Sequence, residues 1–191
     1  MGNASRIIRT ALILGAVALV GAIGAFSAFS SQTDNAGNVV ATGTVVLADN
    51  DAGGSLYGIS NAKPGSSQAS CIRVVYTGSL DADVHLYTPS TIGALGPYVN
   101  LKIEPGTQAS PSFPSCTGFT PEGSPIYNGA LSSFPTSYEG GVVDYPGSGS
   151  KWSKEDSVVY RVTASVSEST PDSAQGTTTG SHTIRWEARS Q

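Results

Sequence analysis

The residue types that most often carry out chemistry are scarce in this chain of 191 residues. Its two histidines, His85 and His182, are far apart, and neither belongs to a His-Glu-x-x-His motif, which places two metal ligands and a base on one helix face. No serine lies in a Gly-x-Ser-x-Gly nucleophile elbow, and neither a phosphate-binding glycine loop nor a dinucleotide fingerprint is present. The sequence therefore predicts no catalytic residue, no metal site and no cofactor.

Two arrangements of polar residues stay open as alternatives. His85 and His182 could meet across a sheet and bind zinc together with Asp83 or Glu187, although a half-exposed structural role is the simpler interpretation of each histidine. Two acidic clusters, residues 49–51 and 81–83, could each ligate calcium, but Asp and Asn side chains more often cap turns by bonding their own backbone.

Cys71 and Cys116 are expected to form a disulfide. In an exported chain a pair of cysteines is more often a disulfide than a metal or redox site, and the alternative is two free buried thiols. The closed loop of about 46 residues would stabilise the fold by about 4 kcal/mol through the lost entropy of the unfolded chain.

The N-terminus has the pattern of a secretory signal peptide. Two arginines precede an apolar run, residues 11–26, and small residues follow it. The run is shorter than the roughly 20 residues that cross a membrane comfortably. We therefore expect cleavage between Ser27 and Ala28, which removes a signal peptide of residues 1–27 and leaves no stable membrane span. The alternative is an uncleaved anchor.

Charge limits the kinds of partner. The formal net charge is −4, and it becomes −6 when the signal peptide and its two arginines are removed. No run of Lys or Arg remains, which argues against nucleic acid and against anionic lipid as partners.

The mature chain has the alternation of apolar and polar residues that is typical of half-buried strands. Between residues 157 and 168 one face carries Val158, Tyr160, Val162, Ala164 and Val166, while Val159 and Arg161 belong to the other. Strands are expected at 39–48, 70–76, 82–87, 100–104, 157–168 and 182–189, separated by turns rich in Gly and Pro. These predict an all-β, jelly-roll-like antiparallel β-sandwich over residues 41–191, preceded by an N-terminal segment, residues 28–40, and by the signal-peptide helix.

Residues 107–150 differ from the rest of the domain. They are rich in Pro, Ser and Gly with isolated aromatics, which is typical of a long insertion that packs back on the sandwich. An insertion of this kind often carries specific function. One alternative is a surface binding module whose ligand, a glycan or a matrix protein, would quench the fluorescence of Trp152; the simpler interpretation is a hydrophobic cluster under a loop.

Four blocks of the sequence resemble the TasA/camelysin (CalY) family of exported proteins, in which a dedicated SipW-type signal peptidase cuts just before the first block. The resemblance covers about half of the chain and none of residues 107–150. The blocks are Ala28-Phe29-Ser30-Ser31 with Val39-Val40-Ala41-Thr42-Gly43-Thr44-Val45-Val46-Leu47, then Asn61-Ala62-Lys63-Pro64-Gly65, then Tyr76-Thr77-Gly78-Ser79-Leu80-Asp81-Ala82, and finally Gln175-Gly176 with Ile184 to Gln191.

The resemblance implies a secreted structural subunit of biofilm-matrix or cell-surface fibres. Subunits of this family assemble head to tail by donor-strand complementation, in which the N-terminal segment of one copy completes a sheet of the next. The implied partners are further copies of the chain, the signal peptidase and an accessory matrix protein. Camelysin relatives are described as cell-surface metallopeptidases, which is the competing implication. The donor strand would include Ala28, Phe29, Ser31, Thr33, Val39 and Val40.

Overall fold

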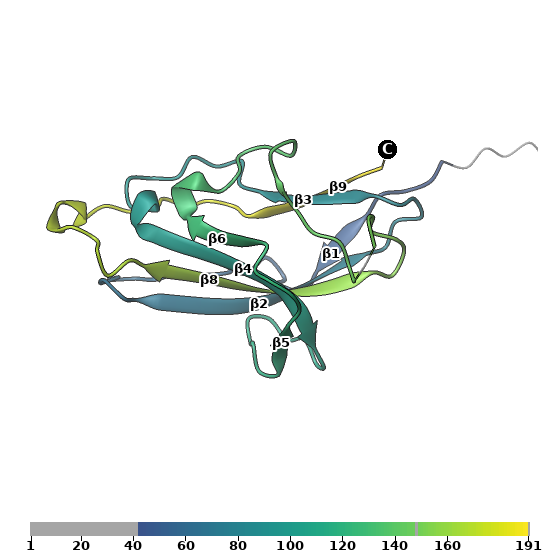
Figure 1. The fold of residues 1–191 in the computed structure, drawn as a ribbon, viewed down its shortest axis with the longest axis horizontal. Helices are drawn as coiled ribbons and strands as arrows, with labels where there is room; N and C mark the ends of the chain where they lie inside the picture. The colour runs from purple at the N-terminus through teal and green to yellow at the C-terminus, as the bar shows by residue number, and fades with distance from the viewer. Residues whose placement is uncertain (1–41, 148, 191) are drawn as a thin grey trace, which may run out of the picture. The chain divides into compact units, whose positions relative to one another are not determined.

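Three strands of ten residues form the framework of the fold (Figure 1). They are β2 (Ser67–Tyr76), β4 (Val99–Gln108) and β8 (Ser157–Val166), and β8 lies between the other two and antiparallel to both. The computed structural model describes residues 42–147 and 149–190. Within these residues the long strands coincide with three of the segments in which the sequence alternates.

Shorter strands complete the larger of two sheets. β1 (Leu47–Asp49) pairs with the last residues of β2, and β5 (Phe119–Pro121) and β6 (Tyr127–Ala130) pair with successive parts of β4. The order is β1-β2-β8-β4-β5, with β6 also bound to β4. All of these pairings are antiparallel.

The smaller sheet packs over the framework strands. It consists of β7 (Val142–Val143), β3 (Asp83–Tyr87) and β9 (Arg185–Arg189), in the order β7-β3-β9. Three short 3-10 turns, η1 (Gly96–Tyr98), η2 (Leu131–Ser133) and η3 (Asp172–Ala174), lie in the connections. The prediction of an all-β antiparallel sandwich is confirmed for the described residues.

The core lies between the two sheets, and β8 supplies much of it. Its predicted inward residues, Val158, Tyr160, Val162, Ala164 and Val166, are all buried. Val159 lies on the opposite face, as predicted, but its side chain is buried there and only 4 % exposed. Its register partner is Gly106, where a Cβ would meet the Phe119 ring. We infer that chain from residues 109–121 covers this outer face of the large sheet.

Two expected strands are shorter than the alternation predicts. Instead of a strand over 39–48, the described residues hold β1 from Leu47. Before β1, Val46 O accepts from the Thr77 amide, and Thr44 exchanges hydrogen bonds with Ser79. Instead of a strand over 182–189, β9 begins at Arg185, so His182 lies before the strand. Within β9, Trp186 and Ala188 pack against the core as predicted.

The segment 107–150 is more regular than its composition predicts. It contributes β5, β6 and β7, and it places Leu131 and Phe134 in the core, where they are 0 % and 2 % exposed. Strands of two to four residues are too short for alternation to reveal. The segment thus serves as part of the sandwich edge rather than as a free loop.

The predictions for the N-terminus lie outside the described residues. These are the signal peptide, the cleavage between Ser27 and Ala28, and the donor residues from Ala28 to Val40. In the part of the chain that the structure describes, no helix has the length and apolarity to cross a membrane.

Candidate functional site

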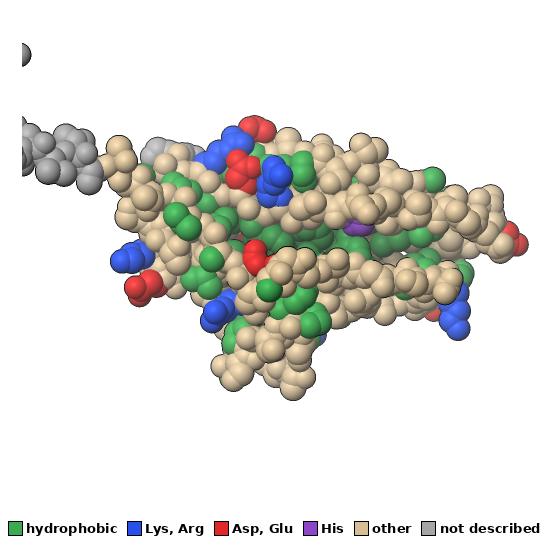
Figure 2. Space-filling view, turned by 180° about the vertical axis from the view of Figure 1, so that it is seen from behind, with side chains coloured by type: hydrophobic (Ala, Val, Ile, Leu, Met, Phe, Trp, Pro, Cys, Tyr) green, Lys and Arg blue, Asp and Glu red, His purple; other side chains and the backbone are tan. Residues whose placement is uncertain are grey.

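A groove runs along the sandwich where the two sheets are not joined by strand pairing. It has a volume of about 1040 Å³. One wall comes from β1, from the end of β2 and from residues 53–60, and the other comes from residues 178–184 and the start of β9. Figure 2 shows a lengthwise band of hydrophobic side chains between two rows of other atoms on this face.

The groove exposes side chains that also belong to the core. Ile72 and Val74 of β2 are buried at its base. The other apolar lining residues are half-buried, and all of them except Ile59 pack against the core cluster. The sandwich is therefore open to solvent along one side of its hydrophobic interior. The apolar lining residues are Leu47, Leu56, Tyr57, Ile59, Ile72, Val74, Ile184 and Trp186.

The two strand edges beside the groove differ in how their backbone groups are satisfied. On the edge of β2, the Cys71 amide donates to Pro114 O at 3.1 Å and the Arg73 amide donates to Asn50 Oδ1 at 2.8 Å. β9 pairs with β3 along one edge, and its other edge has no strand partner among the described residues. An unpaired edge presents N–H and C=O groups that a further strand can bind. Among the described residues, β9 therefore has an edge that is open to pairing, and so does the three-residue strand β1, which ends the large sheet on the opposite wall.

Tyr57 and His182 meet across the groove. The Tyr57 hydroxyl lies 2.6 Å from His182 Nε2, and the ring centroids are 5.5 Å apart. His182 Nδ1 lies 2.9 Å from Gly180 O, which can only accept, so Nδ1 carries the proton and Nε2 of the neutral ring accepts from Tyr57. Burial raises the pKa of Tyr57, which keeps its hydroxyl protonated as the donor.

Polar groups at the mouth of the groove mostly bond their own chain. Asp49 Oδ1 accepts from the Asp51 amide at 3.1 Å, and Asp51 Oδ1 accepts from the Gly53 amide at 2.6 Å. These are the backbone-capping contacts that the simpler interpretation of cluster 49–51 predicts. Burial raises the pKa of Asp49, so its charged form is disfavoured there.

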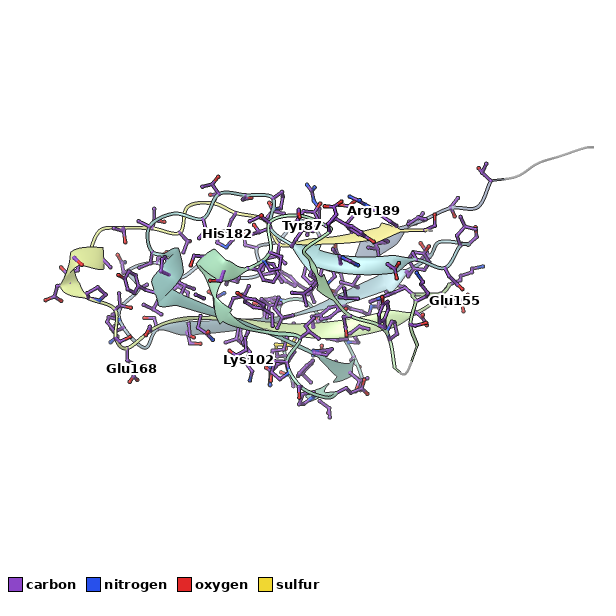
Figure 3. The ribbon with its side chains drawn as sticks, turned by 45° about the horizontal axis from the view of Figure 1, so that its top comes forward. Tyr87, Lys102, Glu155, Glu168, His182 and Arg189 are labelled. Atoms are coloured by element: carbon purple, nitrogen blue, oxygen red, sulfur yellow. A yellow bond between two sulfur atoms is a disulfide. The ribbon has the colours of Figure 1, made fainter. Side chains whose placement is uncertain are left out.

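His85 has a different setting, on the outer face of the small sheet. Its ring stacks on Tyr138 with centroids 4.1 Å apart, and Nδ1 lies 2.7 Å from Tyr138 O. Arg189 covers the Tyr138 ring at 3.8 Å, and Figure 3 shows Arg189 and Tyr87 together over this sheet, away from His182. The structure therefore does not bring the two histidines to one site. Within residues 42–147 and 149–190, no group of three His, Cys, Asp or Glu side chains could hold a metal ion.

The two acidic residues considered as zinc ligands are both engaged. Glu187 accepts a hydrogen bond from the Tyr87 hydroxyl. This bond and the hydrogen bond from Arg189 hold the pKa of Glu187 below its usual range. Asp83 Oδ2 lies 2.6 Å from Lys151 Nζ, and Tyr145 OH donates to Oδ1 at 3.1 Å. The Lys151 hydrogen bond is the main reason that the pKa of Asp83 is lowered.

Replacing Asp83 by Asn is expected to lower the free energy of unfolding by about 1 to 2 kcal/mol at pH 7, because a buried charged hydrogen bond is lost. The folded pKa of Asp83 is depressed, so its contribution is present above the ordinary Asp value of about 4 and disappears as the pH falls through the folded value. Urea unfolding at pH 7 and pH 3 checks this, with Asp81→Asn as the exposed control. An equal difference at both pH values would contradict it.

Two further predictions, on the cysteine pair and on Trp152, can be compared with the structure. The disulfide between Cys71 and Cys116 is present, with Cα atoms 5.0 Å apart. Trp152 is fully buried, and its Nε1 donates to Asp144 O at 2.7 Å. Since no ligand can touch a buried indole directly, the expectation that a ligand would quench Trp152 loses its basis. Sequence reasoning did not single out Tyr57, because its importance arises only from its position across the groove.

Comparisons with known proteins leave the chain without an assigned family. No family model matches it, and no curated protein compared with it is significantly similar.

Proposed function

We propose that this chain is a secreted structural subunit of extracellular fibres. In the proposed assembly, residues 28–40 of one copy add a strand to β9 of the next copy and cover its groove. One observation carries the proposal: a groove with apolar side chains at its base lies open beside β9, whose outer edge has no strand partner among the described residues. The resemblance of the N-terminal blocks to the TasA/camelysin family supports the same reading.

The physical advantage of such a strand is twofold. Backbone groups along β9 would gain hydrogen bonds that a neighbouring strand supplies, as in β-augmentation. Every second side chain of the added strand would cover half-buried residues such as Trp186 and Ile184. Each Å² of apolar surface that is thereby removed from water stabilises the contact between the two copies by about 25 cal/mol. Thirteen extended residues span about 40 Å, which is enough to follow residues 178–189.

The proposed contact uses two different surfaces of the chain, the N-terminal segment of one copy and the groove beside β9 of the next. A contact that uses two different surfaces is heterologous and can propagate as a filament.

Deleting residues 28–38 from the mature protein tests the proposal. The core cluster lies between residues 45 and 188, so the truncated protein should fold with unchanged stability. It should form no fibres in electron micrographs, and a synthetic peptide of residues 28–40 should bind it and shift the fluorescence of half-buried Trp186, while buried Trp152 responds little. Fibres of normal appearance from the truncated protein would show that the donor assignment is wrong.

A further inference from the structure

Two irregular segments face each other across the groove, and each is fixed to its own side. In residues 53–60, the Gly58 amide donates to Gln68 Oε1 of β2 at 3.0 Å. In residues 178–184, the Thr183 amide donates to Ser90 Oγ at 3.1 Å, and Thr179 O accepts from the Gly93 amide at 2.7 Å. Both segments are therefore anchored independently of each other.

The hydrogen bond between Tyr57 and His182 joins these segments. In the described part of the chain it is the one hydrogen bond between them. It spans the space beside residues 178–184, which continue the open edge of β9. A strand that pairs along this edge would have to pass where the two side chains meet.

We infer that the Tyr57–His182 pair is a latch that bridges the groove of a free subunit and must separate before the N-terminal segment of another copy can enter. The inference rests on the proposed function, since it concerns the regulation of the same groove. The bridge makes strand entry slower than it would be without this bond, because the hydrogen bond must break first.

The latch predicts that Tyr57→Phe speeds assembly. The substitution removes the hydroxyl and keeps the aromatic ring, so the apolar wall stays intact. Loss of one half-buried hydrogen bond is expected to increase the rate of fibre growth about fivefold. Tyr98→Phe is the matched control, because it removes a phenolic hydroxyl outside the groove. His182→Ala is the second variant, which removes the acceptor instead of the donor.

Growth of the full mature protein is followed by light scattering and electron microscopy. Hydrogen exchange of residues 53–60 and 178–184 is measured in monomers that lack residues 28–38. Both latch variants should grow faster and exchange faster in these segments, while Tyr98→Phe should match the wild type. If wild-type fibres form but Tyr57→Phe changes neither growth nor exchange, the latch is wrong and the proposed function stands. If the wild type neither forms fibres nor binds the 28–40 peptide, the proposed function itself fails.

Discussion

Replacing Asp49 by Trp should stop fibre growth while leaving the domain folded. Asp49 pairs with Val74 at the edge of the large sheet, lines the groove and is exposed, so a larger side chain there has room to extend into the groove. A bulky indole would occupy the space that the incoming strand needs. We expect growth to fall by more than about tenfold, which corresponds to a loss of about 1.4 kcal/mol in binding free energy.

The matched control is Asp49→Asn, which keeps an oxygen to accept from the Asp51 amide. Since this hydrogen bond is kept and the side chain has nearly the same size, the amide should be tolerated and fibres should grow normally. A stronger test mixes the Asp49→Trp protein with the variant that lacks residues 28–38. One has a donor and a blocked groove, and the other has an open groove and no donor.

This mixture should contain dimers and no fibres, because each pair leaves neither a free donor nor an open groove. Analytical ultracentrifugation distinguishes this outcome from the monomers expected of each variant alone. Fibres from Asp49→Trp alone would mean that the groove is not the acceptor. A mixture that stays monomeric would likewise mean that the groove is not the acceptor.

Alternation in the sequence predicted the long strands because one side of each faces the core over many residues. In β8, every second residue from Val158 to Val166 is buried, so the pattern is strong enough to read without a structure. The alternation does not predict which side chains are buried where both faces of a strand are covered. Val159 is buried on the outer face, and Phe119, which lies 40 residues earlier in the sequence, packs beside its register partner Gly106.

The groove could not be predicted from local pattern. Its walls come from residues 47–60, 72–74 and 178–186, which are brought together only by the packing of two sheets. Trp186 was recognisable as an inward residue, but the open edge of β9 was not, because strand order is a property of the whole fold. Tyr57 and His182 are separated by 125 residues, and neither carries a motif. Their contact is therefore a result of tertiary structure alone.

The prediction of a Cys71–Cys116 disulfide, which rested on the expectation of an exported chain, is confirmed by the bond in the structure. This bond ties two parts of the outer face together. Cys71 lies in β2, and Cys116 lies in the connection between β4 and β5, where Pro114 O also accepts from the Cys71 amide. Cys71 itself is only 2 % exposed, so the bond closes over a buried position of the sheet.

Replacing both cysteines by Ala is expected to lower the free energy of unfolding by about 4 kcal/mol, because the sequence separation of 45 residues gives the unfolded chain a large gain in entropy. A loss of this size should reduce the midpoint of thermal unfolding by about 12 °C for a domain of this length. Denaturant unfolding followed by circular dichroism measures the change, and fibre growth below the new midpoint should persist, because the disulfide lies outside the groove lining. A change below about 1 kcal/mol would mean that the Pro114 contact and the packing of Phe119 already fix this connection without the bond.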